Sequence, residues 1–297
     1  MTKLAIEELD CVYLSYDEPQ KEEFWVRIKN MVPWAVRVDG VKGSDAAHKA
    51  AAAASQTERF VLIDGDNIPD PEFFNQSLTL TDSNEDHVFR WRARNHINGL
   101  VYGNGGISCW TREFVNSMRT HEATDGRSQT QIEFCFDPKY TALHNCYSTT
   151  YPNGTAFQAW RAGFREGVKM CTDQGARVSL TEFENRLWHG NLKNLYVWHN
   201  VGADVDHGPD AIAGARLGTY LTMCTDWDYR QVQSFDTLQA LYDQVNQYDM
   251  NEVSTILKKK LSLPIANMDA DTSKFFKSYT LTQHKNADIM TPAFYDV

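Results

Sequence analysis

Three apolar segments near the N-terminus have the length and residue composition of β-strands: residues 11–19, 34–40 and 59–66. Apolar spacing predicts a helix over residues 20–32, between the first two strands. The alanine-rich segment 43–55 predicts a second helix, with Ser44 as its N-cap. This β-α-β-α-β order predicts an α/β fold with a mainly parallel sheet, right-handed crossovers and flanking helices.

Residues 70–74 predict the start of a further helix, with Asp70 as its cap and Pro71 at the first helical position. Beyond this point the pattern becomes mixed. Residues 87–110 alternate like antiparallel or mixed strands and are interrupted from Gly103 to Gly106. Further along, helical patterns occupy residues 155–170, 211–224 and 236–260, and a strand-like segment occupies residues 194–205. The sequence therefore predicts an α/β domain over residues 1–210, with a helical C-terminal extension over residues 211–297 packed on it.

Composition narrows the class of protein. The net charge of −10 argues against a general attraction to nucleic acid or anionic membranes, although a local basic groove stays open. None of the six cysteines forms a Cys-x-x-Cys pair, which argues against zinc and suits a reducing compartment. No apolar run approaches the roughly 18 residues that span a bilayer, and acidic residues interrupt the N-terminus where a signal peptide is apolar. We therefore expect a soluble, cytoplasmic protein with no membrane partner.

Two carboxylates, Asp64 and Asp66, end the third predicted strand. Residues two apart on a strand share a face, and two like charges that close repel unless a cation lies between them. An EF-hand calcium loop starting at Asp64 is excluded, because Ile68 and Pro69 occupy positions that need a ligand and a glycine. A plain strand-to-turn junction, with the carboxylates bonded to local backbone, stays open beside a metal site.

Asp17, Glu18 and Asp39 likewise lie at the ends of the first two predicted strands. Ligands of parallel sheets bind at the carboxyl ends of the strands. In this order, the segments SYDEP, VKGSDAAHKAA, VLIDGDN and GNGGISCWTREF resemble motifs of the GT-A glycosyltransferases, particularly the family-2-like branch. The resemblance covers about residues 12–119 and extends more weakly to AWRAGF. The whole pattern is also similar to glycosyltransferases of tailed bacteriophages that modify DNA.

The resemblance implies a GT-A, Rossmann-like fold and transfer of a sugar from a nucleotide sugar, UDP-linked by preference. It implies that Asp64 and Asp66 hold Mn²⁺ or Mg²⁺ against the diphosphate, and that Asp64 contacts the ribose. His207 is the candidate third metal ligand, with a surface-loop histidine as the alternative. The other candidates for binding the nucleotide sugar are Tyr16, Asp17, Asp39, Lys42, Lys49, Arg161 and Arg165. A solvated helix face is the alternative interpretation for Lys49, and sheet packing the alternative for Tyr16.

An inverting transferase needs a carboxylate base that accepts the proton of the acceptor hydroxyl. The family places this carboxylate just before a helix that corresponds here to residues 155–164, and the approach Tyr-Pro-Asn-Gly contains none. The remaining upstream candidates are Asp125, Glu133 and Asp137. The stereochemical outcome therefore stays open.

Arg90, Arg92 and Arg94 alternate and so share one strand face. They form either a solvated basic edge strand or, with Gly105 and Gly106 of the adjacent loop, an acceptor-binding surface. The resemblance implies hydroxymethylcytosine in phage DNA as the acceptor, glucose or arabinose as the sugar, and the host cytoplasm as the location. A glycan or protein acceptor, or a non-catalytic nucleotide-sugar-binding protein, is the alternative.

Overall fold

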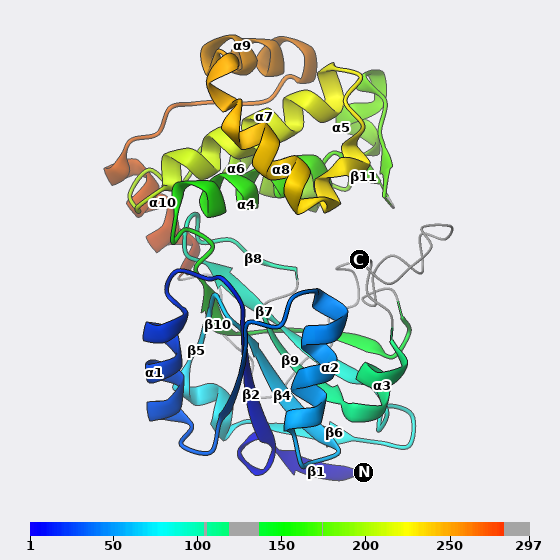
Figure 1. Cartoon of the computed structure of the whole chain (residues 1–297). Helices are drawn as coiled ribbons and strands as arrows, with labels where there is room; N and C mark the ends of the chain where they lie inside the picture. Colours follow the sequence, from blue (N-terminus) through cyan, green and yellow to red (C-terminus); the bar gives the residue numbers. More distant parts are fainter. Residues whose placement is uncertain (104–105, 119–136, 174, 282–297) are drawn as a thin grey trace. The chain divides into compact units, whose positions relative to one another are not determined.

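The computed structural model of the 297-residue chain describes every residue except 104–105, 119–136, 174 and 282–297. The chain forms two compact units (Figure 1). With the gaps just given, unit 1 is built from residues 1–95 and 101–151, and unit 2 from residues 96–100 and 152–283. The boundary predicted after residue 210 falls inside unit 2, within helix α7 (Gly208–Cys224).

Eight strands in the described part of unit 1 form one mixed sheet, in the order β3-β2-β4-β9-β7-β10-β5 with β8 paired to β7. They are β2 (Asp10–Ser15), β3 (Val36–Asp39), β4 (Arg59–Asp64), β5 (Asn67–Pro69), β7 (Val88–Asn95), β8 (Val101–Tyr102), β9 (Ile107–Thr111) and β10 (Tyr140–Thr150). β3, β2 and β4 are parallel, as predicted. β9 runs antiparallel to both β4 and β7, and β7 is parallel to β10. The predicted α/β class, with a mixed sheet and flanking helices, is confirmed.

Alternation along the strands gives this sheet two apolar faces, and helices cover both (Figure 1). α1 (Lys21–Met31) packs through Phe24 and Ile28 against the face that carries Tyr13 and Trp91, here called face A. α2 (Ser44–Ala54) and α3 (Arg112–Ser117) cover the opposite face, here called face B, which carries Leu62 and Trp110.

Two local predictions about unit 1 need correction. The N-cap of α2 is Gly43, which has a φ of 94°, and Ser44 is the first helical residue. Glycine adopts this left-handed conformation without steric cost, which explains its place in the tight β3–α2 turn. The helix predicted at residues 70–74 is a short 3₁₀-helix, η2 (Pro71–Asn75), and a second one, η1 (Ile6–Glu8), precedes β2. A separate two-stranded sheet pairs β1 (Thr2–Ala5) with β6 (Ser77–Leu80).

Unit 2 is mainly helical in its described part. Its longer helices are α4 (Ala156–Lys169), α6 (His189–Trp198), α7, α8 (Phe235–Asp243), α9 (Met250–Leu261) and α10 (Ala270–Leu281). Shorter elements are β11 (Thr172–Asp173), β12 (Ala176–Arg177), η6 (Leu180–Glu182), α5 (Phe183–Arg186), η7 (Tyr229–Gln233) and η8 (Val245–Gln247). No helix in the described residues of either unit is long and apolar enough to cross a membrane.

Two predictions for unit 2 are wrong. The strand-like segment 194–205 begins inside α6, because Leu195 and Trp198 lie three residues apart and are buried together on a helix. The single helix predicted over residues 236–260 is divided into α8 and α9. The Asp249 side chain accepts hydrogen bonds from the backbone N–H groups of Asn251 and Glu252, so it starts a new helix at that point.

Helices α4 and α7 approach each other closely through glycine. A Cβ atom added at Gly163 or Gly167 of α4 would overlap the backbone of α7 at Ala211 and Ala215. Gly214 and Gly218 of α7 face the backbone of α4 in the same way. Both helices therefore carry a Gly-x-x-x-Gly pair whose missing side chains permit backbone contact.

Candidate functional site

The carboxyl ends of three neighbouring parallel strands bring acidic side chains to one edge of the unit 1 sheet. In the strand register Ser15 of β2 lies opposite Asp39 of β3, and Leu14 lies opposite Asp64 of β4. The backbone N–H of Asp64 donates to the carbonyl of Gly106, 2.8 Å away, so the β8–β9 connection reaches the same edge. Open parallel sheets bind their ligands at such an edge.

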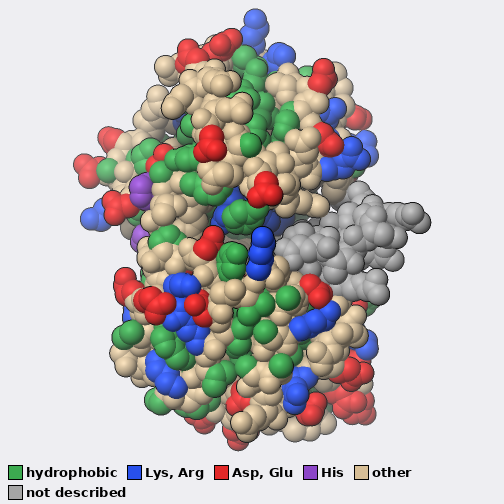
Figure 2. Space-filling view, viewed as in Figure 1, with side chains coloured by type: hydrophobic (Ala, Val, Ile, Leu, Met, Phe, Trp, Pro, Cys, Tyr) green, Lys and Arg blue, Asp and Glu red, His purple; other side chains and the backbone are tan. Residues whose placement is uncertain are grey.

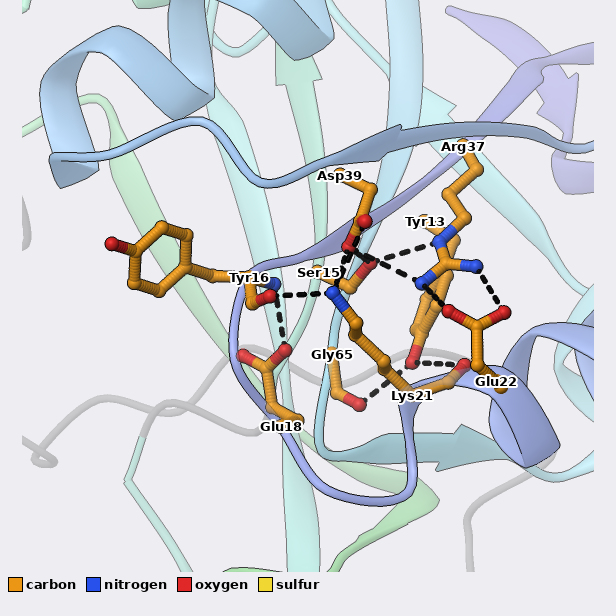
Figure 3. A network of polar contacts seen from close by, with 9 residues as sticks. All are labelled: Tyr13, Ser15, Tyr16, Glu18, Lys21, Glu22, Arg37, Asp39 and Gly65. Carbon is orange, nitrogen blue, oxygen red and sulfur yellow. Dashed lines mark hydrogen bonds and ion pairs between the residues drawn. The ribbon is translucent and has the colours of Figure 1, made fainter.

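A polar network ties the ends of β2 and β3 together (Figure 3). Lys21 Nζ lies 2.8 Å from Oδ1 of Asp39 and also donates to the Tyr16 carbonyl at 2.6 Å. Ser15 Oγ donates to the same carboxylate at 2.7 Å, and Arg37 donates to it at 3.2 Å. The hydrogen bond from Lys21 is the main cause that holds the pKa of Asp39 below its ordinary value. Asp39 thus joins the two strand ends, which leaves less of its carboxylate for the predicted contact with a nucleotide.

Glu18 covers the turn between the two aspartates of β4. A Cβ atom added at Gly65 would lie 2.5 Å from the carboxyl carbon of Glu18, so only glycine leaves room for that carboxylate. The backbone N–H of Tyr16 donates to Oε2 of Glu18 at 2.7 Å, and the Tyr13 hydroxyl donates to the Gly65 carbonyl at 2.7 Å (Figure 3). Glu18, Asp64 and Asp66 therefore form an acidic cluster around Gly65.

The electrostatics of this acidic cluster favour a cation. Loss of hydration, followed by the negative charges of Asp66 and Glu18, raises the pKa of Asp64 to about 8. The Asp64 residue is exposed, so solvent screens part of this effect. Burial and the Glu18 charge also raise the pKa of the Tyr13 hydroxyl, which keeps this group protonated as a donor to Gly65.

The three predicted metal ligands belong to different units. Asp64 and Asp66 lie in unit 1, whereas His207 lies in unit 2, where its Nδ1 is 3.3 Å from Oδ2 of Asp210. Among the residues that the structure describes, no group of three or more His, Cys, Asp or Glu side chains is arranged to hold a metal ion. The acidic cluster nevertheless offers carboxylate oxygens, the donor type that Mg²⁺ and Mn²⁺ prefer. A metal at Asp64 and Asp66, with or without His207, stays a prediction.

The remaining candidates for nucleotide binding in unit 1 are surface residues. Tyr16, Asp17 and Lys42 are exposed in unit 1, and the Tyr16 ring points away from the Lys21–Asp39 network (Figure 3). Lys49 Nζ is 2.6 Å from the Asp45 carboxylate one helical turn earlier, which agrees with the alternative of a solvated helix face.

The two arginines proposed for the diphosphate lie in unit 2. Both are on α4, and the Arg161 guanidinium stacks 3.8 Å from the centre of the Phe235 ring and 5.5 Å from that of Phe157. Arg165 is exposed. The aromatic stacking gives Arg161 a packing role within unit 2.

Of the three candidates for the missing base, the structure describes only Asp137. Asp125, Glu133 and Gly105 lie outside the described residues. Asp137 is exposed, and its Oδ1 accepts a hydrogen bond from the backbone N–H of Lys139 at 2.8 Å. Such a bond is typical of an Asp in a surface turn.

The alternation of the three arginines on β7 is confirmed, but the edge-strand alternative is wrong. β7 lies inside the sheet, paired with β10 on one side and with β8 and β9 on the other. Arg90 is only 4% exposed and donates to the Gly103 carbonyl, while Arg92 and Arg94 are half-buried. On the surface in Figure 2, Lys and Arg side chains are interspersed with Asp and Glu, in keeping with the acidic net charge.

Sequence reasoning overlooked Glu18 as a member of the acidic cluster and Gly65 as the residue that makes room for it. The signal was present in the acidic pair Asp17-Glu18 before Pro19. The structure separates this pair, because Asp17 is exposed whereas Glu18 turns back onto β4.

No protein-family model matches the chain, and no curated protein matches it. Among solved structures, the inositol-1-phosphate CTP transferase from T. maritima aligns with a TM-score of 0.32 and 8% sequence identity. The alignment covers 50% of this chain and 91% of that chain. At this TM-score the likeness supports no assignment of fold family or function to this chain, and the GT-A fold stays a prediction.

Proposed function

We propose that unit 1 binds a nucleotide sugar with a divalent cation and transfers the sugar to a hydroxyl acceptor. The observation that supports this proposal best is the acidic cluster of Glu18, Asp64 and Asp66, at the carboxyl edge of parallel strands. This edge is the ordinary ligand site of the fold class. A phosphate ligand would be repelled by the carboxylates of the acidic cluster unless a cation lay between them.

The proposed reaction breaks the bond between the sugar C1 and the diphosphate oxygen and forms a bond from C1 to the acceptor oxygen. The bond electrons leave with the diphosphate, and the acceptor proton passes to a base that the described residues do not identify. A bound Mn²⁺ or Mg²⁺ would neutralise the charge that develops on the leaving diphosphate. Asp64 and Asp66 would hold the ion, while the Tyr13–Gly65 hydrogen bond fixes the turn between them.

Binding of Mn²⁺ is expected to depend on pH through Asp64. Because its pKa is raised from 3.8 to about 8, the folded protein retains a proton that the unfolded chain loses. The stabilisation that comes from this proton is complete below pH 3.8, which is the pKa of the group in the unfolded chain. It is lost as the pH rises through about 8, the pKa in the folded protein. Mn²⁺ must displace the proton, so its affinity should rise by up to about tenfold per pH unit below the pKa and then level off.

Calorimetric titration with Mn²⁺ between pH 6 and pH 8.5 measures this dependence. The Asp64→Asn variant should bind more weakly and with a flatter pH profile. An equally steep profile in Asp64→Asn, or a flat profile in the wild type, would remove Asp64 from the metal site.

The experiment that tests the proposed function is turnover of a panel of UDP-linked sugars. The full chain is incubated with each sugar in Mn²⁺ or in EDTA, with and without duplex DNA containing hydroxymethylcytosine, the acceptor that the resemblance implies. We expect UDP release in Mn²⁺ but not in EDTA, and a mass increase of one sugar in the modified nucleoside. Unmodified duplex is the control. Nucleotide-sugar binding that is indifferent to metal and gives no turnover would favour the non-catalytic alternative.

A further inference from the structure

A chain of contacts runs from the end of β3 to the acidic cluster and passes through Lys21, the first residue of α1 (Figure 3). The Lys21 ammonium lies 2.8 Å from the Asp39 carboxylate and donates to the Tyr16 carbonyl at 2.6 Å. The backbone N–H of Tyr16 donates to the Glu18 carboxylate at 2.7 Å. Tyr16 is therefore held by Lys21 at its carbonyl and by Glu18 at its N–H.

The backbone around Lys21 adds to this constraint. Its N–H donates to the Glu18 carbonyl at 3.1 Å, and Pro19 restricts Glu18 to extended conformations. The Tyr13 hydroxyl lies 2.7 Å from the Gly65 carbonyl and 3.3 Å from the Lys21 carbonyl. The start of α1 and the turn after β4 therefore share one anchor, and the Glu18 carboxylate lies over Gly65 between them.

The place of Glu18 suits the outer shell of a cation held by Asp64 and Asp66. In the described part of the chain no three carboxylates are arranged to hold a metal, so Glu18 is not a third direct ligand. A divalent ion held by one or two carboxylates keeps several water molecules, and a neighbouring carboxylate accepts hydrogen bonds from such water. Outer-shell groups of this kind contribute about 10–100-fold to metal affinity.

We propose that Lys21 is a positioning residue, which keeps Glu18 over Gly65 and thereby raises the affinity of the acidic cluster for a divalent cation. This inference rests on the proposed function, because it takes Asp64 and Asp66 as the metal ligands. It deepens that function by assigning control of the metal site to a residue outside the acidic cluster.

The sign of the effect separates positioning from plain electrostatics. A lysine ammonium repels a cation that binds near it, so charge alone predicts that removing Lys21 strengthens cation binding. Positioning predicts the opposite, because Glu18 is released from the acidic cluster when the Tyr16 carbonyl loses its donor.

The first test is calorimetric titration of Mn²⁺ into the full chain. Lys21→Met should bind about tenfold more weakly than the wild type, and Lys21→Arg should recover most of the affinity. Glu18→Gln should lose a similar factor, and the double variant should lose no more than either single variant, because both changes remove one contribution. The control is Lys29→Met on α1, since Lys29 carries the same charge and also donates to a backbone carbonyl, that of Ala35 at 2.8 Å. It should leave the affinity unchanged.

The second test needs no metal. Hydrogen exchange of the Tyr16 amide, measured in EDTA by nuclear magnetic resonance, reports the hydrogen bond to Glu18. Lys21→Met should speed this exchange by about tenfold, and Lys21→Arg should restore slow exchange. Unfolding curves establish that each variant is folded.

The outcomes separate this role of Lys21 from the proposed function. Mn²⁺ binding in Lys21→Met that equals or exceeds the wild-type affinity would overturn the positioning role. So would unchanged exchange of the Tyr16 amide, or a double variant whose loss is the product of the two single losses. These results leave the proposed function intact, because Asp64 and Asp66 would still hold the ion. Coupled losses of Mn²⁺ affinity in a protein that turns over no nucleotide sugar would refute the proposed function and support the role of Lys21.

Discussion

Replacing Asp66 by asparagine should lower Mn²⁺-dependent turnover of the nucleotide sugar by about 10²–10³-fold. Asparagine has nearly the shape of aspartate, so the turn after β4 and the Tyr13–Gly65 hydrogen bond should persist. The substitution removes a negative charge from the acidic cluster and leaves a weaker ligand for the cation. The loss should appear mainly at low Mn²⁺ concentration and should diminish as the metal concentration rises.

Asp82→Asn is the matched control, because Asp82 is exposed in unit 1 outside the acidic cluster and the net charge changes equally. Turnover is followed as UDP release over a range of Mn²⁺ concentrations. If Asp66→Asn retained the wild-type rate and the wild-type Mn²⁺ dependence, Asp66 would have no part in the metal site and the strand-to-turn alternative would stand.

Replacing Gly163 by alanine should destabilise unit 2 by about 2 kcal/mol or more. Alanine is the better helix former by about 1 kcal/mol, so an open site would be stabilised by the change. At Gly163 the added methyl overlaps the backbone carbonyl of Ala211. This overlap can be relieved only if α4 and α7 move apart, because the Ala211 carbonyl is part of the α7 backbone. Separation would disturb the packing of both helices, including the buried residues Trp160 and Phe164.

The control for this change is Gly190→Ala on α6 of the same unit. There the added methyl meets the ring of Trp188, a side chain that is 47% exposed and free to turn aside. Urea unfolding followed by helical circular dichroism should show a lower midpoint for Gly163→Ala and little change for Gly190→Ala. Equal stability of Gly163→Ala and the wild type would mean that α4 and α7 are not in backbone contact.

The first half of the fold follows from sequence patterns because strong local signals agree with one another. Apolar strand segments around Val12 and Leu62 alternate with helical spacing around Ile28, and this alternation predicts that β2, β3 and β4 are parallel. The acidic residues at the strand ends follow from the same logic, since strand direction determines the edge at which Asp64 must lie.

Long-range pairing accounts for what the sequence could not predict. The alternation of Arg90, Arg92 and Arg94 gives their shared face but not their neighbours, and only the pairing with β9 and β10 shows that β7 is an internal strand. Likewise, Gly163 and Gly214 lie about fifty residues apart, and their complementarity emerges only when α4 meets α7. The selection of Glu18 over Asp17 depends on a backbone turn that composition does not encode.

The most direct measurement of the central claim is calorimetric titration of UDP into the full chain, in Mn²⁺ and in EDTA. The metal clamp at Asp64 and Asp66 predicts measurable UDP binding in Mn²⁺, a large loss of affinity in EDTA, and the same loss in Asp66→Asn with Mn²⁺ present. UDP affinity that is equal in Mn²⁺ and EDTA, or unaffected by Asp66→Asn, would contradict it.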